Sequence, residues 1–351
     1  MTHRFAINGF GRIGRNILRR QIETTNEAID IIAINDLAPV DTMAHLLKYD
    51  SIHGRLKADV AVKDGDLLVN GKRIRVSAER APEDLNWSDV DVALECTGIF
   101  TKRDAAARHL KNGSRRVLIS APGTDVDRTV VFGVNHTELT AKDVIVSNAS
   151  CTTNCLAPLA KVLEEHCGIE TGYMTTIHSF TGDQPSHDTD HKDLYRARAA
   201  SLSMVPTSTG AARAISLVLP ALEGRIEGSA IRVPTPNVSL VDLTFVPRRV
   251  TTASAVNAAM REAASGPLEG ILSVETDAMV SIDFNHDSHS SCFAAGQTTV
   301  TEAGLVRVVS WYDNEWGFSC RMLDTAVRMA ALANGGNGQK GIAVTTSMAA
   351  E

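Results

Sequence analysis

The sequence has few cysteines, no basic excess and no long hydrophobic run. Among its 351 residues are six cysteines, and 35 basic and 41 acidic residues give a formal net charge of −6. Proteins that bind nucleic acid usually carry a basic patch or excess, so we expect no nucleic-acid partner. No window approaches the roughly 18 apolar residues of a membrane span, so we expect no membrane partner.

The N-terminus also lacks the pattern of a secretory signal. Met1 to Arg4 leads directly into an apolar stretch, without a long apolar run and a small-residue cleavage site. Sparse cysteines without a secretory signal are typical of free thiols in a reducing compartment. These patterns predict a cytoplasmic protein.

The length and the first half of the chain predict two domains, of which the first contains a mostly parallel sheet. A chain this long usually divides its core. Short apolar strands alternate with helical patterns, which is typical of βαβ units. The expected strands are Phe5–Ile7, Ile29–Ile34, Val90–Cys96 and Arg116–Ser120, with a helix over Asp104–Lys111 among them.

After about residue 150 the pattern changes to longer alternating strands. The expected helices are Cys155–His166, Ala253–Ala264 and Gly317–Ala333, and the expected strands are Gly172–His178, Ser229–Val233, Val238–Val246, Met279–Phe284 and Leu305–Trp311. The stretch from Ser179 to Ser203 has no clear periodicity, and a loop of that length is usually functional. The tail from Asn334 is rich in Gly, Ser and Thr and is predicted to be disordered.

A glycine-rich turn near the N-terminus matches the dinucleotide-binding pattern GxGxxG. It consists of Gly9, Phe10, Gly11, Arg12, Ile13 and Gly14, follows a predicted strand, opens a predicted helix and is followed by Asp36 at the end of the next strand. In this pattern the glycines allow a tight turn, approach of a pyrophosphate and close helix packing. Asp36 would bond ribose hydroxyls and repel a 2′-phosphate, which favours NAD over NADP. The alternative is an ordinary glycine turn with a solvent-facing aspartate.

Cys151 has the setting of a nucleophile. It lies among small and polar residues between the apolar run Val144–Val146 and a predicted helix. A helix N-terminus favours the thiolate form, and a thiolate can add to an aldehyde. Free cysteines are often buried as small apolar residues, and we interpret Cys155 and the other four cysteines in that way.

His178 is the candidate proton carrier. It ends a predicted strand and opens the long loop. A histidine beside a cysteine can stabilise a thiolate and move a proton, although an isolated histidine at a strand end is more often structural. His286 and His289 lack neighbours at the spacing of a metal site, so we predict no metal.

Several motifs together resemble the glyceraldehyde-3-phosphate dehydrogenase family over nearly the whole chain. The resemblance rests on the glycine-rich turn, the segment Ser147–Cys155, Thr207–Ala212, Arg232–Asn237 and Trp311–Gly317, which follow in family order. It implies an α/β Rossmann NAD-binding domain over 1–150 and 316–333. An α+β catalytic domain with a mixed sheet would span 151–315. It also implies a homotetramer whose long loop lines a neighbouring subunit's cofactor site.

The resemblance further implies a mechanism. Cys151 would attack the aldehyde of glyceraldehyde 3-phosphate, His178 would accept the proton, hydride would pass to NAD, and inorganic phosphate would release the thioester. Asn314 would hold the nicotinamide carboxamide, and Arg80, Thr97 and Ser120 would make further cofactor contacts. The substrate phosphate would bind Thr181, Arg232 and Arg196. Inorganic phosphate would bind Ser150, Thr152, Thr209, Gly210 and Arg196.

Two departures leave alternatives. Thr189-Asp190 replaces the Leu-Pro pair that is usual in NAD-specific members, although an acidic residue would also disfavour a 2′-phosphate. The segments Met43–Arg55 and Asp283–Asp287 also resemble erythrose-4-phosphate dehydrogenase, which releases its product by hydrolysis, but Thr181 and the Thr207–Ala212 motif favour the phosphorylating enzyme. Aspartate-semialdehyde dehydrogenase and a non-catalytic NAD sensor fit these motifs less well.

Overall fold

The computed structural model describes residues 2–24 and 27–333, which form two layered units joined by the last helix. The first unit is built on a sheet with the strand order β10-β11-β9-β8-β1-β2-β7-β6-β5. Its strands are β1 His3–Asn8, β2 Ile29–Asn35, β5 Val60–Lys63, β6 Asp66–Val69, β7 Lys72–Ser77, β8 Val92–Glu95, β9 Val117–Ile119, β10 Arg128–Thr129 and β11 Ile145–Ser147. The pairs from β10 to β7 are parallel, whereas β7-β6-β5 form an antiparallel edge.

The second unit is built on a mixed sheet with the strand order β13-β14-β12-β15-β19-β17-β16. Its strands are β12 Ile169–Ser179, β13 Val205–Ser208, β14 Ile226–Val233, β15 Ser239–Pro247, β16 Leu272–Glu275, β17 Ser291–Ala294 and β19 Val306–Tyr312, and β18 Thr299–Val300 pairs with β19. β12 runs parallel to β14 and antiparallel to β15. The two sheets together confirm the predicted fold class.

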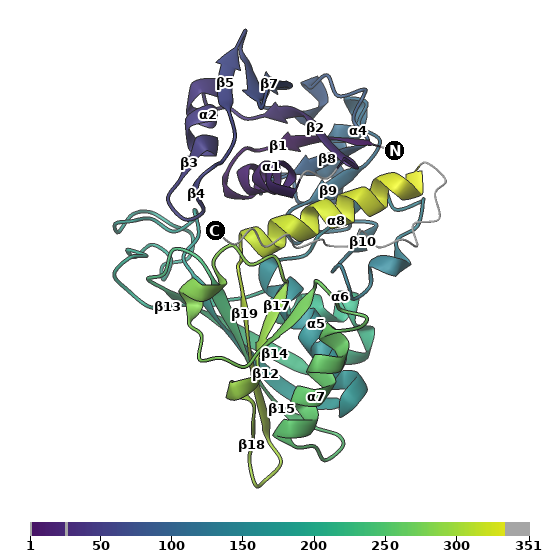
Figure 1. The fold of residues 1–351 in the computed structure, drawn as a ribbon, viewed down its shortest axis with the longest axis vertical. Coiled ribbons are helices and arrows are strands. Elements are labelled where there is room, and N and C mark those ends of the chain that lie inside the picture. The colour runs from purple at the N-terminus through teal and green to yellow at the C-terminus, as the bar shows by residue number, and fades with distance from the viewer. Residues whose placement is uncertain (1, 25–26, 334–351) are drawn as a thin grey trace.

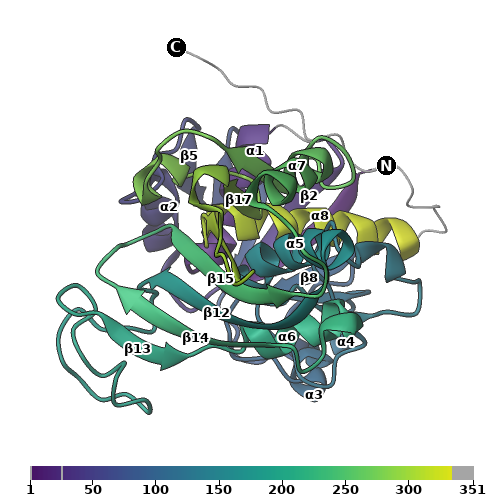
Figure 2. The same ribbon diagram turned by 90° about the horizontal axis from the view of Figure 1, so that it is seen from below.

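The helices cover these sheets and join them. They are α1 Arg12–Thr24, α2 Val40–Lys48, α3 Arg103–Ala106, α4 Arg108–Lys111, α5 Cys151–His166, α6 Ala211–Val218, α7 Ala253–Ala264 and α8 Trp316–Ala333. Helices α5, α6 and α7 lie together on one side of the second sheet, as Figure 2 shows from below. No helix of residues 2–24 and 27–333 is long and apolar enough to cross a membrane.

The final helix leaves the second sheet and returns to the first unit. Its residues Phe318, Met322, Leu323 and Met329 belong to the same buried cluster as Phe5 of β1. In Figure 1 α8 runs between the upper and lower units. Because α8 follows the second sheet but buries its apolar face in the core of the first unit, it holds the two units together.

Most predicted elements are present, two differ, and several short elements were not predicted. Met279–Phe284 is not a strand, because Ser281–Phe284 forms a 3-10 turn. Asp104–Lys111 is divided at Ala107 into α3 and α4. A two-stranded ribbon (β3 Tyr49–Asp50, β4 Gly54–Arg55), α2 and the β5–β7 edge were not predicted, since their short strands carry weak periodicity. The predicted disordered tail lies outside the described residues.

A pair of glycine substitutions tests the close packing at the start of α1. A Cβ at Gly14 would lie 2.2 Å from the carbonyl oxygen of Gly9, whereas a Cβ at Gly11 would meet nothing within 4 Å. We expect Gly14→Ala to lower the free energy of unfolding by about 1–3 kcal/mol. Gly11→Ala, the matched control, should stay within about 0.5 kcal/mol of wild type. Urea denaturation measures both, and equal stabilities would contradict this packing argument.

Candidate active site

The glycine-rich turn forms one wall of a hollow at the carboxyl ends of the parallel strands. β1 ends at Asn8, and Gly9 then adopts φ +93°, with the turn so close to the next strand that a Cβ would lie 2.7 Å from the backbone nitrogen of Thr97. The hollow has a volume of about 350 Å³. Its lining comprises Asn8, Gly9, Gly11, Asn35, Asp36, Leu37, Glu79, Arg80, Cys96, Thr97, Ile99 and Phe100.

The hollow fits a dinucleotide. Gly11 faces open space, so an added Cβ would project into the volume that an approaching pyrophosphate needs. The Asp36 carboxylate is oriented by the N–H groups of Phe10, at 2.7 Å, and Ala38, at 2.9 Å. A fixed carboxylate at the end of the second strand suits ribose hydroxyls and disfavours a 2′-phosphate.

The predicted cofactor residues divide into two groups. Gly9, Gly11, Asp36, Arg80 and Thr97 line the hollow, whereas Phe10, Arg12, Ile13, Gly14, Ser120 and Asn314 do not. The Arg12 side chain instead forms ion pairs with Asp50, at 2.5 Å, and with Glu315. Only its backbone, at the first residue of α1, is placed for an anion.

Buried polar residues at and beneath the hollow were missed by the sequence analysis, namely Asn8, Asn35, Glu95 and His109, whereas Thr97, which bonds Glu95, was predicted. The Asn8 amide donates to Glu95 at 2.6 Å, and Glu95 contacts His109 at 2.8 Å. The Asn35 amide donates to Asn8 at 2.8 Å, and the hydroxyl of Thr97 donates to Glu95. Polar residues at the ends of otherwise apolar strands were the available signal, since such positions meet at one edge of a parallel sheet.

A sharp turn presents Cys151. Ala149 has φ +57°, a left-handed conformation that is uncommon for a residue with a side chain. Ser150 then caps α5 by accepting the N–H of Thr153 at 3.1 Å, and Cys151 is the first residue of the helix. The half-buried Cys151 contacts both large hydrophobic cores, so it lies where the two units meet.

Cys151 and His178 form the pair that the sequence could not demonstrate. The sulfur lies 3.5 Å from Nε2 of His178, which is 3% exposed on β12. Nδ1 of the same ring lies 2.7 Å from the carbonyl oxygen of Ser179, which can only accept. With its proton on Nδ1, donated to Ser179, the ring presents the lone pair of Nε2 to the sulfur.

The charge state of this pair differs from the expectation of a thiolate. Burial raises the pKa of the Cys151 thiol, and this outweighs the opposing effects of the Arg232 charge and the N–H groups at the start of α5. Burial and the nearby Arg232 charge lower the pKa of His178 to about 3. Both shifts favour the neutral forms, a thiol beside an imidazole.

Two arginines and a threonine form a basic site beside the pair. Nη1 of Arg232 donates to the carbonyl oxygen of Ser179 at 3.0 Å and to Thr181 at 3.2 Å, and it lies 2.9 Å from Nδ1 of His178. Nη1 of Arg196 donates to Asp183 at 2.7 Å, and the Thr181 hydroxyl also donates to Asp183. Burial would raise the pKa of Asp183, but Thr181, Arg196 and Arg232 together lower it. Asp183, which the sequence analysis missed, thus occupies donors that were predicted to bind phosphate.

The other predicted anion ligands lie at helix starts. The Thr209 hydroxyl accepts the N–H of Ala211 at 3.2 Å, and Gly210 caps α6 with open space on its Cα. Thr152 is turned inward, with its hydroxyl 2.9 Å from that of Tyr312. Thr209 and Gly210 are therefore free to meet an anion, whereas the Thr152 hydroxyl is engaged in the core.

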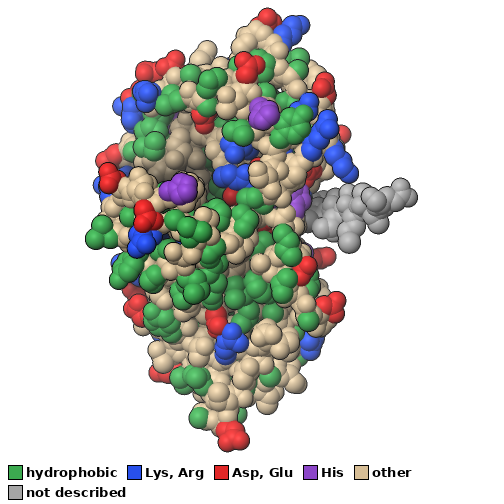
Figure 3. Space-filling model, turned by 90° about the vertical axis from the view of Figure 1, so that its left-hand side faces the viewer, with side chains coloured by type: hydrophobic (Ala, Val, Ile, Leu, Met, Phe, Trp, Pro, Cys, Tyr) green, Lys and Arg blue, Asp and Glu red, His purple; other side chains and the backbone are tan. Residues whose placement is uncertain are grey.

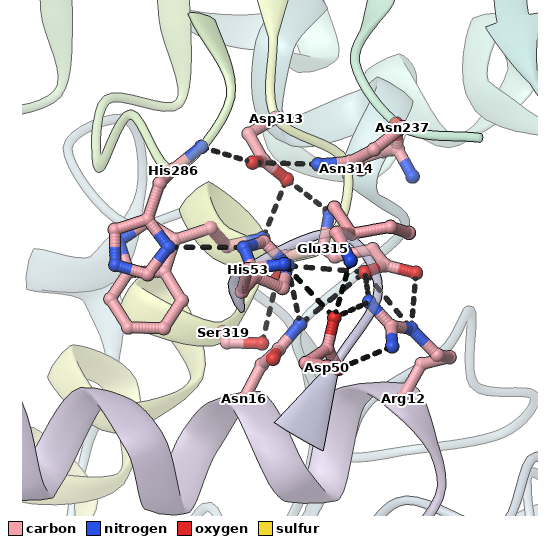
Figure 4. A network of polar contacts seen from close by, with 12 residues as sticks. Arg12, Asn16, Asp50, His53, Asn237, His286, Asp313, Asn314, Glu315 and Ser319 are labelled. Carbon is pink, nitrogen blue, oxygen red and sulfur yellow. Dashed lines mark hydrogen bonds and ion pairs between the residues drawn. The ribbon is translucent and has the colours of Figure 1, made fainter. Parts of the chain in front are cut away.

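Asn314 is fixed close to the same strands. Its side-chain oxygen accepts the hydroxyls of Ser179 and Ser239, each at 2.9 Å, and the residue is 4% exposed. Asp313 and Glu315 flank it at the start of α8 (Figure 4). Ser179 at the end of β12 and Ser239 at the start of β15 thus set the orientation of this amide.

His289, for which the sequence predicted no metal site, lies close to two other possible ligands. Side chains of Asp287, His289 and Cys292 offer ligand atoms within 4.8 Å of one another. Nδ1 of His289 already lies 2.8 Å from the Asp287 carboxylate, and the same carboxylate bonds Cys292. These bonds account for the cluster as a hydrogen-bonded group.

The long loop presents apolar side chains to solvent. Leu194, Leu202 and Met204 are 82%, 78% and 74% exposed. Figure 3 shows hydrophobic side chains gathered across the middle of one face of the molecule. Thr189 and Asp190, which replace the family's Leu-Pro pair, line a separate hollow of about 570 Å³ with His191, Lys192, Leu194 and Ala197. Exposed apolar surface of this kind usually marks an interface.

Comparison with known proteins agrees with this geometry. The model of the glyceraldehyde 3-phosphate dehydrogenase NAD binding domain matches residues 3–103, and the model of the C-terminal domain of the same enzyme matches residues 150–314. A glyceraldehyde-3-phosphate dehydrogenase from Cereibacter sphaeroides is 61% identical over 95% of this chain and 100% of its own. Those from Xanthobacter flavus and Geobacillus stearothermophilus are 59% and 52% identical, over 95% and 94% of this chain and 100% and 99% of their own.

These relatives do not favour the erythrose-4-phosphate alternative, because the curated proteins that match along almost their full length carry the other name. The matched NAD-binding model also agrees with the glycine-lined hollow and with Asp36. The chain belongs to the glyceraldehyde-3-phosphate dehydrogenase family.

Proposed function

We propose that the protein oxidises glyceraldehyde 3-phosphate with NAD and inorganic phosphate, and that Cys151 carries the acyl group. The observation that carries the proposal is the 3.5 Å contact between the Cys151 sulfur and Nε2 of His178, beside a basic site. The names of the relatives support the substrate. NAD, when bound, supplies the hydride acceptor.

The proposed roles of the protein's own residues follow from the geometry. His178 accepts the Cys151 proton as sulfur bonds to the aldehyde carbon, because the lone pair of Nε2 faces the sulfur and Nδ1–H is held by Ser179. Arg232 disfavours a charged imidazole, which keeps His178 available as a base. The acyl group remains on Cys151 as a thioester until phosphate attacks.

The basic site supports two bound anions. Thr181, Arg196 and Arg232 would hold the substrate phosphate, since arginines and hydroxyls suit phosphate oxygens. Thr209 and Gly210 at the start of α6, with Ser150 and Arg196, would hold inorganic phosphate. A role for the Thr152 hydroxyl requires it to leave Tyr312.

We also infer the domain limits and the assembly. The NAD-binding unit would comprise 1–150 with 316–333, because α8 packs into the core of β1, and the catalytic unit 151–315. The exposed apolar side chains of the 180–204 loop support a homotetramer in which the loop meets a neighbouring subunit. A reducing compartment, which the sequence analysis predicts as the cytoplasm, would keep Cys151 a thiol.

An activity assay with and without phosphate tests the proposed reaction. We expect NADH formation from glyceraldehyde 3-phosphate to require inorganic phosphate, and Cys151→Ser to lower kcat by roughly 10³-fold or more. Cys155→Ser, one helical turn further into the core, is the matched control and should keep most activity. Phosphate-independent turnover, with erythrose 4-phosphate as the better substrate, would refute the proposal.

His178→Gln tests the base and its charge state. We expect kcat to fall roughly 10²- to 10⁴-fold. The lowered pKa of folded His178, about 3, also predicts that acid destabilises the wild type. The unfolded chain gains this proton near an ordinary pKa of about 6.5 while the folded one does not. Between about pH 6 and pH 4 the wild type should therefore lose up to about 1.4 kcal/mol per pH unit more than the variant. Urea unfolding at each pH measures this difference. If the free energy of unfolding falls equally in wild type and His178→Gln, His178 is not held neutral.

Asp183→Asn tests whether this carboxylate competes with phosphate. Asp183 is held in its ionised form by Thr181 and Arg196, the donors proposed for the substrate phosphate. Removing its charge while keeping its shape should lower the KM for glyceraldehyde 3-phosphate several-fold in steady-state kinetics. Asp188→Asn, whose carboxylate pairs instead with the exposed Arg198, is the control. An unchanged or higher KM in Asp183→Asn would mean that Asp183 does not compete with the substrate phosphate.

A further inference from the structure

Two histidines from different units meet at the base of α8. His53 lies in the turn between β3 and β4, and His286 lies in the loop before β17. Their Nδ1 atoms are 3.0 Å apart, and Figure 4 shows the rings end to end within a larger polar network. The side chain of His53 is fully buried, and the His286 ring stacks on Trp316 with 3.6 Å between centroids.

The second nitrogen of each ring faces a carboxylate. Nε2 of His53 lies 3.2 Å from Glu315, and it also lies 3.1 Å from the side-chain nitrogen of Asn16. Nε2 of His286 lies 2.9 Å from Glu23. Each ring therefore has a carboxylate on its outer side and the other ring on its inner side.

Because the rings meet through their Nδ1 atoms, only one of the two can be protonated at both Nδ1 and Nε2. An Nδ1–Nδ1 hydrogen bond needs an N–H on one side and a lone pair on the other. With two neutral rings, Asn16 can donate to His53, His53 to His286, and His286 to Glu23. One added proton on Nε2 of His53 is accommodated by Glu315. A further proton would leave two N–H groups facing each other at 3.0 Å.

The charges around the pair come from every element packed on it. Helix α1 contributes Arg12, Arg15, Arg19 and Glu23, and the β3–β4 ribbon contributes Asp50. The segment between β19 and α8 contributes Asp313 and Glu315, and the loop of His286 contributes Asp287 and His289. Acidic groups flank both rings. Each ring thus lies between an acidic group and the other ring, and an N–H on both Nδ1 atoms is incompatible with their 3.0 Å contact.

The same loop is connected to the proposed cofactor residues. The backbone N–H of His286 donates to Asp313 at 2.7 Å, and Asp313 also accepts the N–H groups of Glu315 and Trp316. Asn314 lies between these residues. Glu315 in turn pairs with Arg12, the first residue of the helix after the glycine-rich turn.

We propose that His53 and His286 are positioning residues whose contact holds the segment around Asn314 against the glycine-rich turn, and that protonation of both rings opens this contact and weakens NAD binding. The proposal rests on the cofactor role proposed for Asn314. It does not depend on the chemistry at Cys151.

Calorimetric titration of the full chain with NAD, without substrate, tests the proposal between about pH 8 and pH 5, where histidines ordinarily titrate. We expect the Kd of wild type to rise on acidification, by at most about tenfold per pH unit for one linked proton. His286→Gln and, from the other side, His53→Gln remove the contact at every pH, so they should flatten this dependence and raise the Kd at pH 8 towards that of acidified wild type. His45→Gln, an exposed histidine on α2, is the matched control and should follow wild type.

A second readout needs no cofactor. His286 stacks on Trp316, so opening of the contact should change tryptophan fluorescence of the NAD-free protein over the same pH range, and His286→Gln should abolish that change. Parallel pH profiles of NAD affinity and fluorescence in wild type and both variants, or a flattened profile in His45→Gln, would overturn the proposal. Loss of turnover in Cys151→Ser leaves these binding measurements unaffected, so the two proposals fail separately.

Discussion

The buried carboxylate of Asp313 is the constraint on which the rest of the site depends. It accepts hydrogen bonds from the Asn237 amide at 2.8 Å and from three backbone N–H groups, those of His286, Glu315 and Trp316, at 2.7 to 2.9 Å. Burial raises the pKa of Asp313, because few charged groups offset its loss of hydration. A charge so deeply placed is tolerable only when its lone pairs are satisfied. These bonds therefore fix the end of β19, the start of α8 and the Asn314 between them.

The return of α8 places chemistry from the second sheet beside the turn of the first. Arg12 meets Glu315 across this boundary, and burial, which would lower the pKa of Arg12, is outweighed by its bonds to Glu315 and Asp50, which raise it. Breaking a buried pair of this kind leaves a charge without compensation, which is costly. The cofactor hollow and the Cys151–His178 pair are thus parts of one connected structure.

The reactive pair depends on burial as much as on charge. A helix start and Arg232 both favour a thiolate, but desolvation at the junction of two cores outweighs them. The resulting neutral pair is less exposed to unwanted oxidation than a free thiolate, since reactivity follows thiolate content. Asp183 has a related effect in the basic site, where it satisfies Arg196 and Thr181 until an anion competes for them.

The sequence alone determined the local parts of this protein. GxGxxG followed by Asp36 predicted the dinucleotide turn, because its glycine spacing and strand context allow few other structures. The helix Ala253–Ala264 was predicted with its observed limits, since its apolar periodicity is strong. Cys151 was singled out by its position between a strand and a helix.

Only the tertiary structure decided which distant residues meet and how they are charged. The pairing of Cys151 with His178, the diversion of the Arg12 side chain to Glu315, the part played by Asp183 and the contact of His53 with His286 all join residues from different strands or units. The state of the Cys151 thiol was reversed for the same reason. A helix N-terminus can be predicted from the local sequence, but the desolvation of the Cys151 sulfur depends on all the residues that pack around it.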